Sequence, residues 1–203
     1  MSLYIHHEFW KKIRTGSRLI LLCWSVSVLG LTACERKEST VPVTPNTKQG
    51  LRQVIEALLA TAQVQQETKL IEQVNEVLPT GGEVEKLLRV NELNKGLGQH
   101  YEQNMRQSAQ AEWPWALQEL VKKGYTEISI TRVSPLSGAD NAPGDLALLE
   151  QLKNRDGLYT VRIHPKDSEK GLRINSWVYV NKKWITLLKL GEVIEDRGSK
   201  VDL

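Results

Sequence analysis

Residues 173–190 read RINSWVYVNKKWITLLKL, and this stretch indicates two β-strands joined by a tight turn near Asn181-Lys182-Lys183. Aromatic and β-branched residues on both sides of a short polar turn are typical of a hairpin. A turn at 181–182 or at 182–183 pairs residues whose numbers add to an odd total. The register therefore predicts one face carrying Trp177, Tyr179, Trp184, Thr186 and Leu188, and another carrying Val178, Val180, Ile185 and Leu187.

The aromatic face of this hairpin has two interpretations. Trp177, Tyr179 and Trp184, together with Tyr159 of the preceding strand, either pack in the core or line a pocket or partner surface. Exposed aromatic patches usually bind something, which favours the second interpretation. Core packing is preferred, and a binding surface made by these four residues is the alternative.

Two further strands are expected before the hairpin. From Tyr125 to Thr131 apolar and polar residues alternate with a period of two, and LYTVRIHP at 158–165 reads as a second strand. A loop rich in proline and glycine and a short helix or turn, LALLEQLK at 146–153, separate them.

The N-terminal half has the period of helices. Apolar residues recur at helical spacing from Leu51 to Val77, where Leu78-Pro79 stops the pattern. The stretch 80–83, Thr-Gly-Gly-Glu, resembles a capping box that starts another helix.

A further helix is expected from about Leu97 to Ala111. Trp113-Pro114-Trp115 then predicts a new helix over 114–122, because proline suits the first turn of a helix.

Helices first and antiparallel strands afterwards predict an α+β domain, with N-terminal helices packed on one face of an about four-stranded C-terminal sheet. This order, over roughly 50–191, resembles the NTF2-like or cystatin-like group, in which helices fill a curved four-stranded sheet. VYVNKKWITLLKLG at 178–191 is similar to the closing segment of small bacterial proteins of unassigned function. The resemblance implies a fold and carries over no catalytic residue.

The chain opens with a positive segment, KKIRTGSR at 11–18, followed by an uncharged apolar run from Leu19 to Ala33. As a helix this run would span about 22 Å, which is shorter than a hydrocarbon core of about 30 Å. A positive flank, a short apolar run and small residues before a boundary predict an export signal over residues 1–33. An uncleaved signal anchor is the alternative.

Leu31-Thr32-Ala33-Cys34 at the end of this run resembles the lipobox of bacterial lipoproteins. The resemblance implies that Cys34 is joined to diacylglycerol, that the signal is cut before it, and that the new amino terminus is acylated, for instance with palmitate. Glu35 in the next position weakly favours the outer over the inner membrane. We therefore expect a lipid-anchored protein of the bacterial cell envelope that faces the periplasm.

The mature chain divides into three parts by composition. Residues 34–48 are polar, contain two prolines and predict an extended tether. Residues 49–194 predict the globular domain, and 195–203, ending EDRGSKVDL, predict a frayed C-terminal tail.

The charge balance argues against a nucleic-acid partner. The whole chain has 27 basic and 24 acidic residues, and the leader contains four of the former and one of the latter. The remainder is therefore neutral, without the basic stripe of a nucleic-acid binder.

No catalytic, metal or cofactor motif stands out. His100 and His164 have no second ligand at metal-binding spacing, so we expect them to be exposed or hydrogen-bonded. Arg132, Arg162 and Arg173 on the strands either bind an anion or discourage edge pairing, which is the preferred interpretation.

Two functions from different classes follow. The first is a non-enzymatic envelope protein, held to the membrane through a lipid on Cys34, that binds an unknown protein or small ligand. The alternative is a periplasmic hydrolase or isomerase with an NTF2-like cone as its active site. The missing nucleophile, metal and cofactor motifs favour the first.

Overall fold

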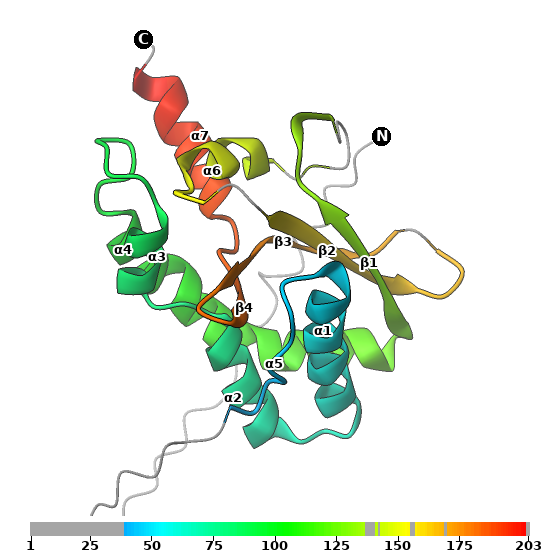
Figure 1. The fold of residues 1–203 in the computed structure, drawn as a ribbon. Helices are drawn as coiled ribbons and strands as arrows, with labels where there is room; N and C mark the ends of the chain where they lie inside the picture. The colour runs from blue at the N-terminus through cyan, green and yellow to red at the C-terminus, as the bar shows by residue number, and fades with distance from the viewer. Residues whose placement is uncertain (1–38, 137–140, 142, 155–156, 169, 202–203) are drawn as a thin grey trace, which may run out of the picture. The chain divides into compact units, whose positions relative to one another are not determined.

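A computed structural model describes residues 39–136, 141, 143–154, 157–168 and 170–201. The expected export signal, the lipobox and Cys34 lie outside these residues. The described chain is a mixed α+β domain, in which most helices precede a four-stranded antiparallel sheet, as the sequence predicts (Figure 1). No helix in the described ranges is both long and apolar enough to cross a bilayer.

The helical half precedes the sheet in the chain. Its elements are α1 (Lys48–Gln63), α2 (Glu67–Val77), α3 (Gly81–Leu87), α4 (Leu97–His100), the π-helical segment η2 (Tyr101–Arg106) and α5 (Gln107–Lys122). The second half contains β1 (Tyr125–Arg132), α6 (Asp145–Gln151), β2 (Leu158–Pro165), β3 (Leu172–Val180), β4 (Lys183–Thr186) and α7 (Leu190–Val201).

Side-chain caps begin two of the helices. The Thr47 hydroxyl accepts a hydrogen bond from the backbone N–H of Gly50 at the start of α1. Thr80 and Glu83 form a reciprocal capping box at the start of α3, which confirms the prediction from the sequence.

The expected break at Trp113-Pro114-Trp115 is wrong. Pro114 lies inside α5, and the chain is helical without interruption from Leu97 to Lys122. An internal proline costs a helix about 3 kcal/mol. Ala109, Pro114 and Leu117 are all buried, so packing of this face holds the helix through the position where local preference would end it.

The sheet is a meander with strand order β1-β2-β3-β4 and antiparallel pairing throughout. Trp177 pairs with Thr186, and Tyr179 pairs with Trp184, which confirms the predicted register of the hairpin. The turn residues Asn181 and Lys182 both have positive φ, as a two-residue hairpin turn requires.

Strand β4 is shorter than the sequence pattern suggests. It ends at Thr186, and Leu188 has a φ of 52°, so this residue does not continue the aromatic face as expected. The backbone turns there because Leu190 already begins α7.

Helices cover both faces of the sheet, which corrects the expectation of one covered face. Trp177 and Trp184 pack in a core with α1, α2 and α5, whereas Val178 and Ile185 pack in a second core with α3, α6 and α7. Figure 1 shows α6 and α7 above the sheet and α1 and α5 below it. The aliphatic face requires this second layer because burying such side chains stabilises the fold by about 25 cal/mol per Å².

The expected C-terminal tail is also wrong over most of its length, because α7 continues to Val201. Ile194 is buried in the second core. The Arg197 guanidinium donates to the backbone carbonyls of Leu93, at 3.1 Å, and Lys95, at 2.9 Å. These bonds join α7 to the loop before α4.

Replacement of Trp184 by alanine should lower the free energy of unfolding by about 3–5 kcal/mol, because the indole is 2 % exposed and its loss leaves a large cavity. Urea unfolding followed by circular dichroism measures this change. Trp115→Ala is the matched control, since that side chain is 41 % exposed, and it should cost clearly less. Equal losses in the two variants would contradict the assignment of Trp184 to the core.

Candidate functional site

The structure brings together the four aromatic residues singled out in the sequence. Trp177 and Trp184 are fully buried, Tyr159 is 9 % exposed and Tyr179 is half-buried. The Trp184 ring meets Tyr159 and Tyr179 edge to face, with ring centroids 5.5 and 5.2 Å apart. These side chains belong to the core, as the preferred interpretation has it, and they form no open patch.

Residues 39–47, which we call the strap, cover the outer edge of this aromatic cluster. The Tyr179 hydroxyl donates to the Thr44 carbonyl at 2.9 Å, and the Trp184 indole N–H donates to the Pro45 carbonyl at 3.2 Å. Thr44 is itself buried. The expectation that residues 34–48 form an extended tether ahead of the packed domain is therefore wrong for the strap, because the strap packs on the domain.

The other end of the strap is held by α2. The Glu76 carboxylate accepts hydrogen bonds from the Ser39 hydroxyl, from the Thr40 N–H at 2.7 Å, from the Thr40 hydroxyl at 2.8 Å and from the Val41 N–H at 3.1 Å. The Gln73 amide donates to the Thr40 carbonyl at 3.0 Å. One carboxylate thus satisfies two backbone and two hydroxyl donors of the strap.

These hydrogen bonds change the acidity of Glu76. Partial burial alone would raise the pKa of the carboxyl, but the donors from Ser39, Thr40 and Val41 outweigh it and lower the pKa below its ordinary value of 4.5. The carboxylate is therefore charged, and the contact intact, at neutral pH.

The strap also depends on a glycine in α1. A Cβ atom at Gly50 would lie 2.1 Å from the Pro45 carbonyl oxygen, so any larger residue there would push the strap away. The sequence contains no pattern that reveals this approach, because it depends on the path of the chain before the helix.

A small pocket lies beside the strap, with a volume of about 110 Å³. Tyr179 lies in the wall of this pocket and also belongs to the aromatic cluster under the strap. The lining residues are Asn46, Lys86, Leu87, Leu152, Lys153, Asn154, Gly157, Val178, Tyr179 and Val180. Sequence reasoning did not find this pocket, because its walls come from segments far apart in the chain.

The two histidines of the domain are hydrogen-bonded, as the sequence suggested. His164 Nε2 lies 2.9 Å from the Ser129 hydroxyl, and its Nδ1 lies 3.0 Å from the Pro165 carbonyl oxygen. His100 contacts the side-chain amide of Asn104. In the described part of the chain no group of three or more His, Cys, Asp or Glu side chains is placed to hold a metal ion.

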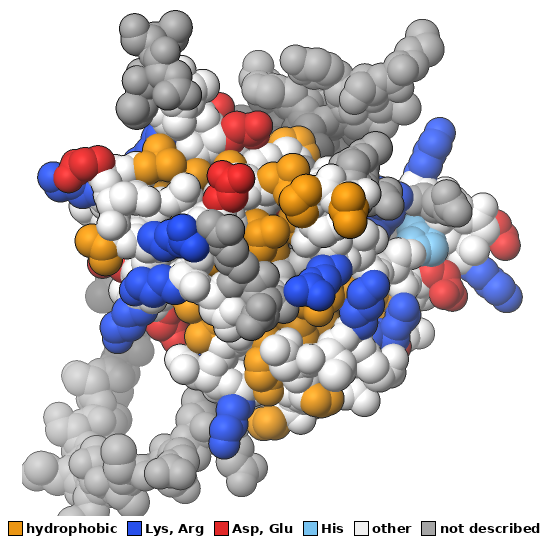
Figure 2. All heavy atoms as spheres, turned by 45° about the horizontal axis from the view of Figure 1, so that its top comes forward, with side chains coloured by type: hydrophobic (Ala, Val, Ile, Leu, Met, Phe, Trp, Pro, Cys, Tyr) orange, Lys and Arg blue, Asp and Glu red, His pale blue; other side chains and the backbone are white. Residues whose placement is uncertain are grey.

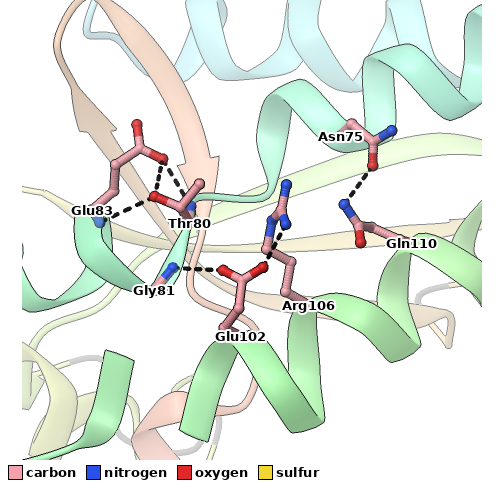
Figure 3. Close-up of polar contacts among 7 residues, drawn as sticks. All are labelled: Asn75, Thr80, Gly81, Glu83, Glu102, Arg106 and Gln110. Atoms are coloured by element: carbon pink, nitrogen blue, oxygen red, sulfur yellow. Dashed lines mark hydrogen bonds and ion pairs between the residues drawn. The ribbon is translucent and has the colours of Figure 1, made fainter. Parts of the chain in front are cut away.

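Two other clusters of polar side chains join elements of the fold to one another. The buried Asp145 carboxylate accepts from the hydroxyls of Thr160, at 2.8 Å, and Ser176, at 3.0 Å, and so joins α6 to the sheet. Glu102 accepts from the N–H of Gly81 at 2.7 Å and pairs with Arg106 at 2.6 Å, which holds α3 against η2 (Figure 3).

The strand arginines require a correction. Arg162 and Arg173 are direct register partners on β2 and β3, the two inner strands. Protection of a sheet edge therefore cannot explain them, although it fits Arg132 on the edge strand β1. Figure 2 shows basic and acidic side chains interspersed over the face that it displays, without a single-sign stripe.

No family model, no curated protein and no solved structure matches this chain.

Acidification should release the strap from α2. Folding lowers the pKa of Glu76, so the charged carboxylate stabilises the folded protein at any pH above its ordinary pKa of 4.5. This stabilisation is lost as the pH falls below 4.5 and through the lower pKa of the folded protein. The amide proton resonances of Thr40 and Val41 should therefore shift as the pH falls below 4.5. In Glu76→Gln these resonances should be shifted already at pH 7 and should not titrate.

Glu56→Gln on the exposed side of α1 is the matched control, and it should preserve the wild-type titration. A Glu76→Gln variant that titrates like the wild type would contradict the role assigned to this carboxylate.

Proposed function

We propose that the protein is a lipid-anchored protein of the bacterial cell envelope and that its α+β domain is a non-enzymatic binding module. The lipid would sit on Cys34, after removal of residues 1–33 as an export signal. Two or more acyl chains hold a protein stably at a membrane, whereas one chain binds only marginally. Glu35 after the cysteine favours the outer membrane.

The strap is the observation that carries this proposal. Ser39, the first residue that the structure describes, is hydrogen-bonded to Glu76 and follows Cys34 by five positions in the sequence. An extended chain covers at most about 3.3–3.6 Å per residue, so five residues span at most about 17 Å. A lipid on Cys34 would therefore keep the domain next to the bilayer.

A binding role is supported by what the domain presents. The described residues form a pocket at the edge of the strap, which could hold a ligand. The buried carboxylate of Asp145 accepts from two hydroxyl groups and joins α6 to the sheet, so its role is structural. An NTF2-like active site would need an open space on one face of the sheet, here the face that α1, α2 and α5 cover. Trp177 and Val161 fill that position in the first core.

Changing Cys34 to serine tests the anchor. The variant should remain an uncleaved precursor and should take up no radiolabelled palmitate, because serine offers no thiol for the diacylglycerol. Cys23→Ser, within the apolar run, is the matched control and should be processed and labelled normally. Normal cleavage and labelling of Cys34→Ser would refute the lipobox assignment.

One observation favours the alternative of an envelope hydrolase. With the proton on Nδ1 of His164 donating to the Pro165 carbonyl, Nε2 accepts the hydroxyl proton of Ser129. This is the polarity in which a histidine base activates a serine nucleophile. Ser129 is exposed on β1, however, and neither residue lines the pocket, so the binding role is the better supported of the two.

A fluorophosphonate probe separates the two functions. Under the proposed binding role we expect no labelling of Ser129 by this serine-directed reagent. Labelling that is lost in Ser129→Ala and retained in Ser108→Ala, a control at an exposed serine on α5, would instead establish a hydrolase.

A further inference from the structure

The pocket beside the strap exists because two distant segments are joined. Leu88, after α3, and Leu152, after α6, form an isolated antiparallel bridge. The Lys153 N–H donates to the Leu87 carbonyl at 2.9 Å in the same contact. This short pairing places Lys86 and Lys153 in the same wall of the pocket.

The remaining walls come from the sheet and the strap. The end of β3, Val178–Val180, lies along one side, and Asn46 of the strap lies at another. The pocket therefore includes the segment that leads toward Cys34, and its shape depends on the strap remaining docked through Tyr179 and Trp184.

The charge of the pocket is positive. Lys86 and Lys153 line it, and none of the described lining residues is acidic. The exposed Lys153 ammonium donates to the backbone carbonyl of Lys86 at 2.8 Å, which fixes it beside the end of α3 and leaves further N–H donors for a ligand.

Apolar and uncharged polar groups complete the lining. Leu87, Leu152, Val178 and Val180 supply aliphatic surface, and Asn46 and Asn154 supply amides. At about 30 Å³ for each water molecule, 110 Å³ holds about four waters, which is the size of a short organic anion. Few polar groups around an apolar surface are typical of small-molecule sites.

We propose that this pocket binds a small aliphatic carboxylate, with its anionic group at Lys86 and Lys153 and its alkyl chain on the leucine and valine side chains. The inference rests on the proposed binding role of the domain. It is independent of the lipid on Cys34, because all the lining residues lie within the folded domain.

The test is a titration of the isotope-labelled full-length protein, purified in detergent with its native N-terminus, with sodium butyrate at constant ionic strength. Amide resonances of Gly157, Tyr179 and Val180 should shift together, with a Kd in the millimolar range (about −4 kcal/mol). The double variant Lys86→Met, Lys153→Met should raise the Kd about tenfold or more, because charge-assisted hydrogen bonds to the carboxylate are lost.

Lys69→Met on α2 is the matched control, since this exposed lysine does not line the pocket, and it should leave the Kd unchanged. Neutral butyramide and the bulky anion 2-naphthoate should both bind at least tenfold more weakly than butyrate. The proposal is overturned if butyrate shifts none of these amides, if the double variant keeps the wild-type Kd, or if either comparison ligand binds as well as butyrate. Loss of processing or lipidation at Cys34 affects none of these outcomes, so failure of the anchor and failure of the pocket are distinguishable.

Discussion

The β3–β4 hairpin imposes the constraint on which the rest of the domain depends, because both of its faces are apolar. Trp177 and Trp184 point to one side, and Val178 and Ile185 point to the other. Neither side can be left in water without losing the free energy of apolar burial, about 25 cal/mol for each Å². Two helical layers follow from this requirement, one made by α1, α2 and α5 and one made by α3, α6 and α7.

The aromatic side of the hairpin creates a second requirement, which the strap meets. The hydroxyl of the half-buried Tyr179 and the indole N–H of the buried Trp184 lie where hydrogen-bond partners are favourable. The carbonyls of Thr44 and Pro45 provide these partners at the edge of the sheet. The strap therefore closes the edge of the first core.

Features governed by neighbours in the sequence were predictable. The hairpin register follows from the position of a two-residue turn, and the α3 cap follows from Thr80 and Glu83 three positions apart. Pro114 was misjudged because its local preference is outweighed by burial of the α5 face. The last helix was missed because its contacts are remote in the chain. Ile194 packs in the second core, and Arg197 donates to the carbonyls of Leu93 and Lys95.

The sequence by itself determined the α+β class and the pairing of the hairpin, since both depend on residue periodicity and on the position of a short turn; the lipid on Cys34 stays a prediction from a short motif. Only the tertiary structure decided that residues 39–47 are strap rather than tether and that Lys86 and Lys153 share a pocket. The physical reason is that these contacts join residues more than thirty positions apart. Such pairings are selected by the packing of the whole domain, and no local pattern encodes them.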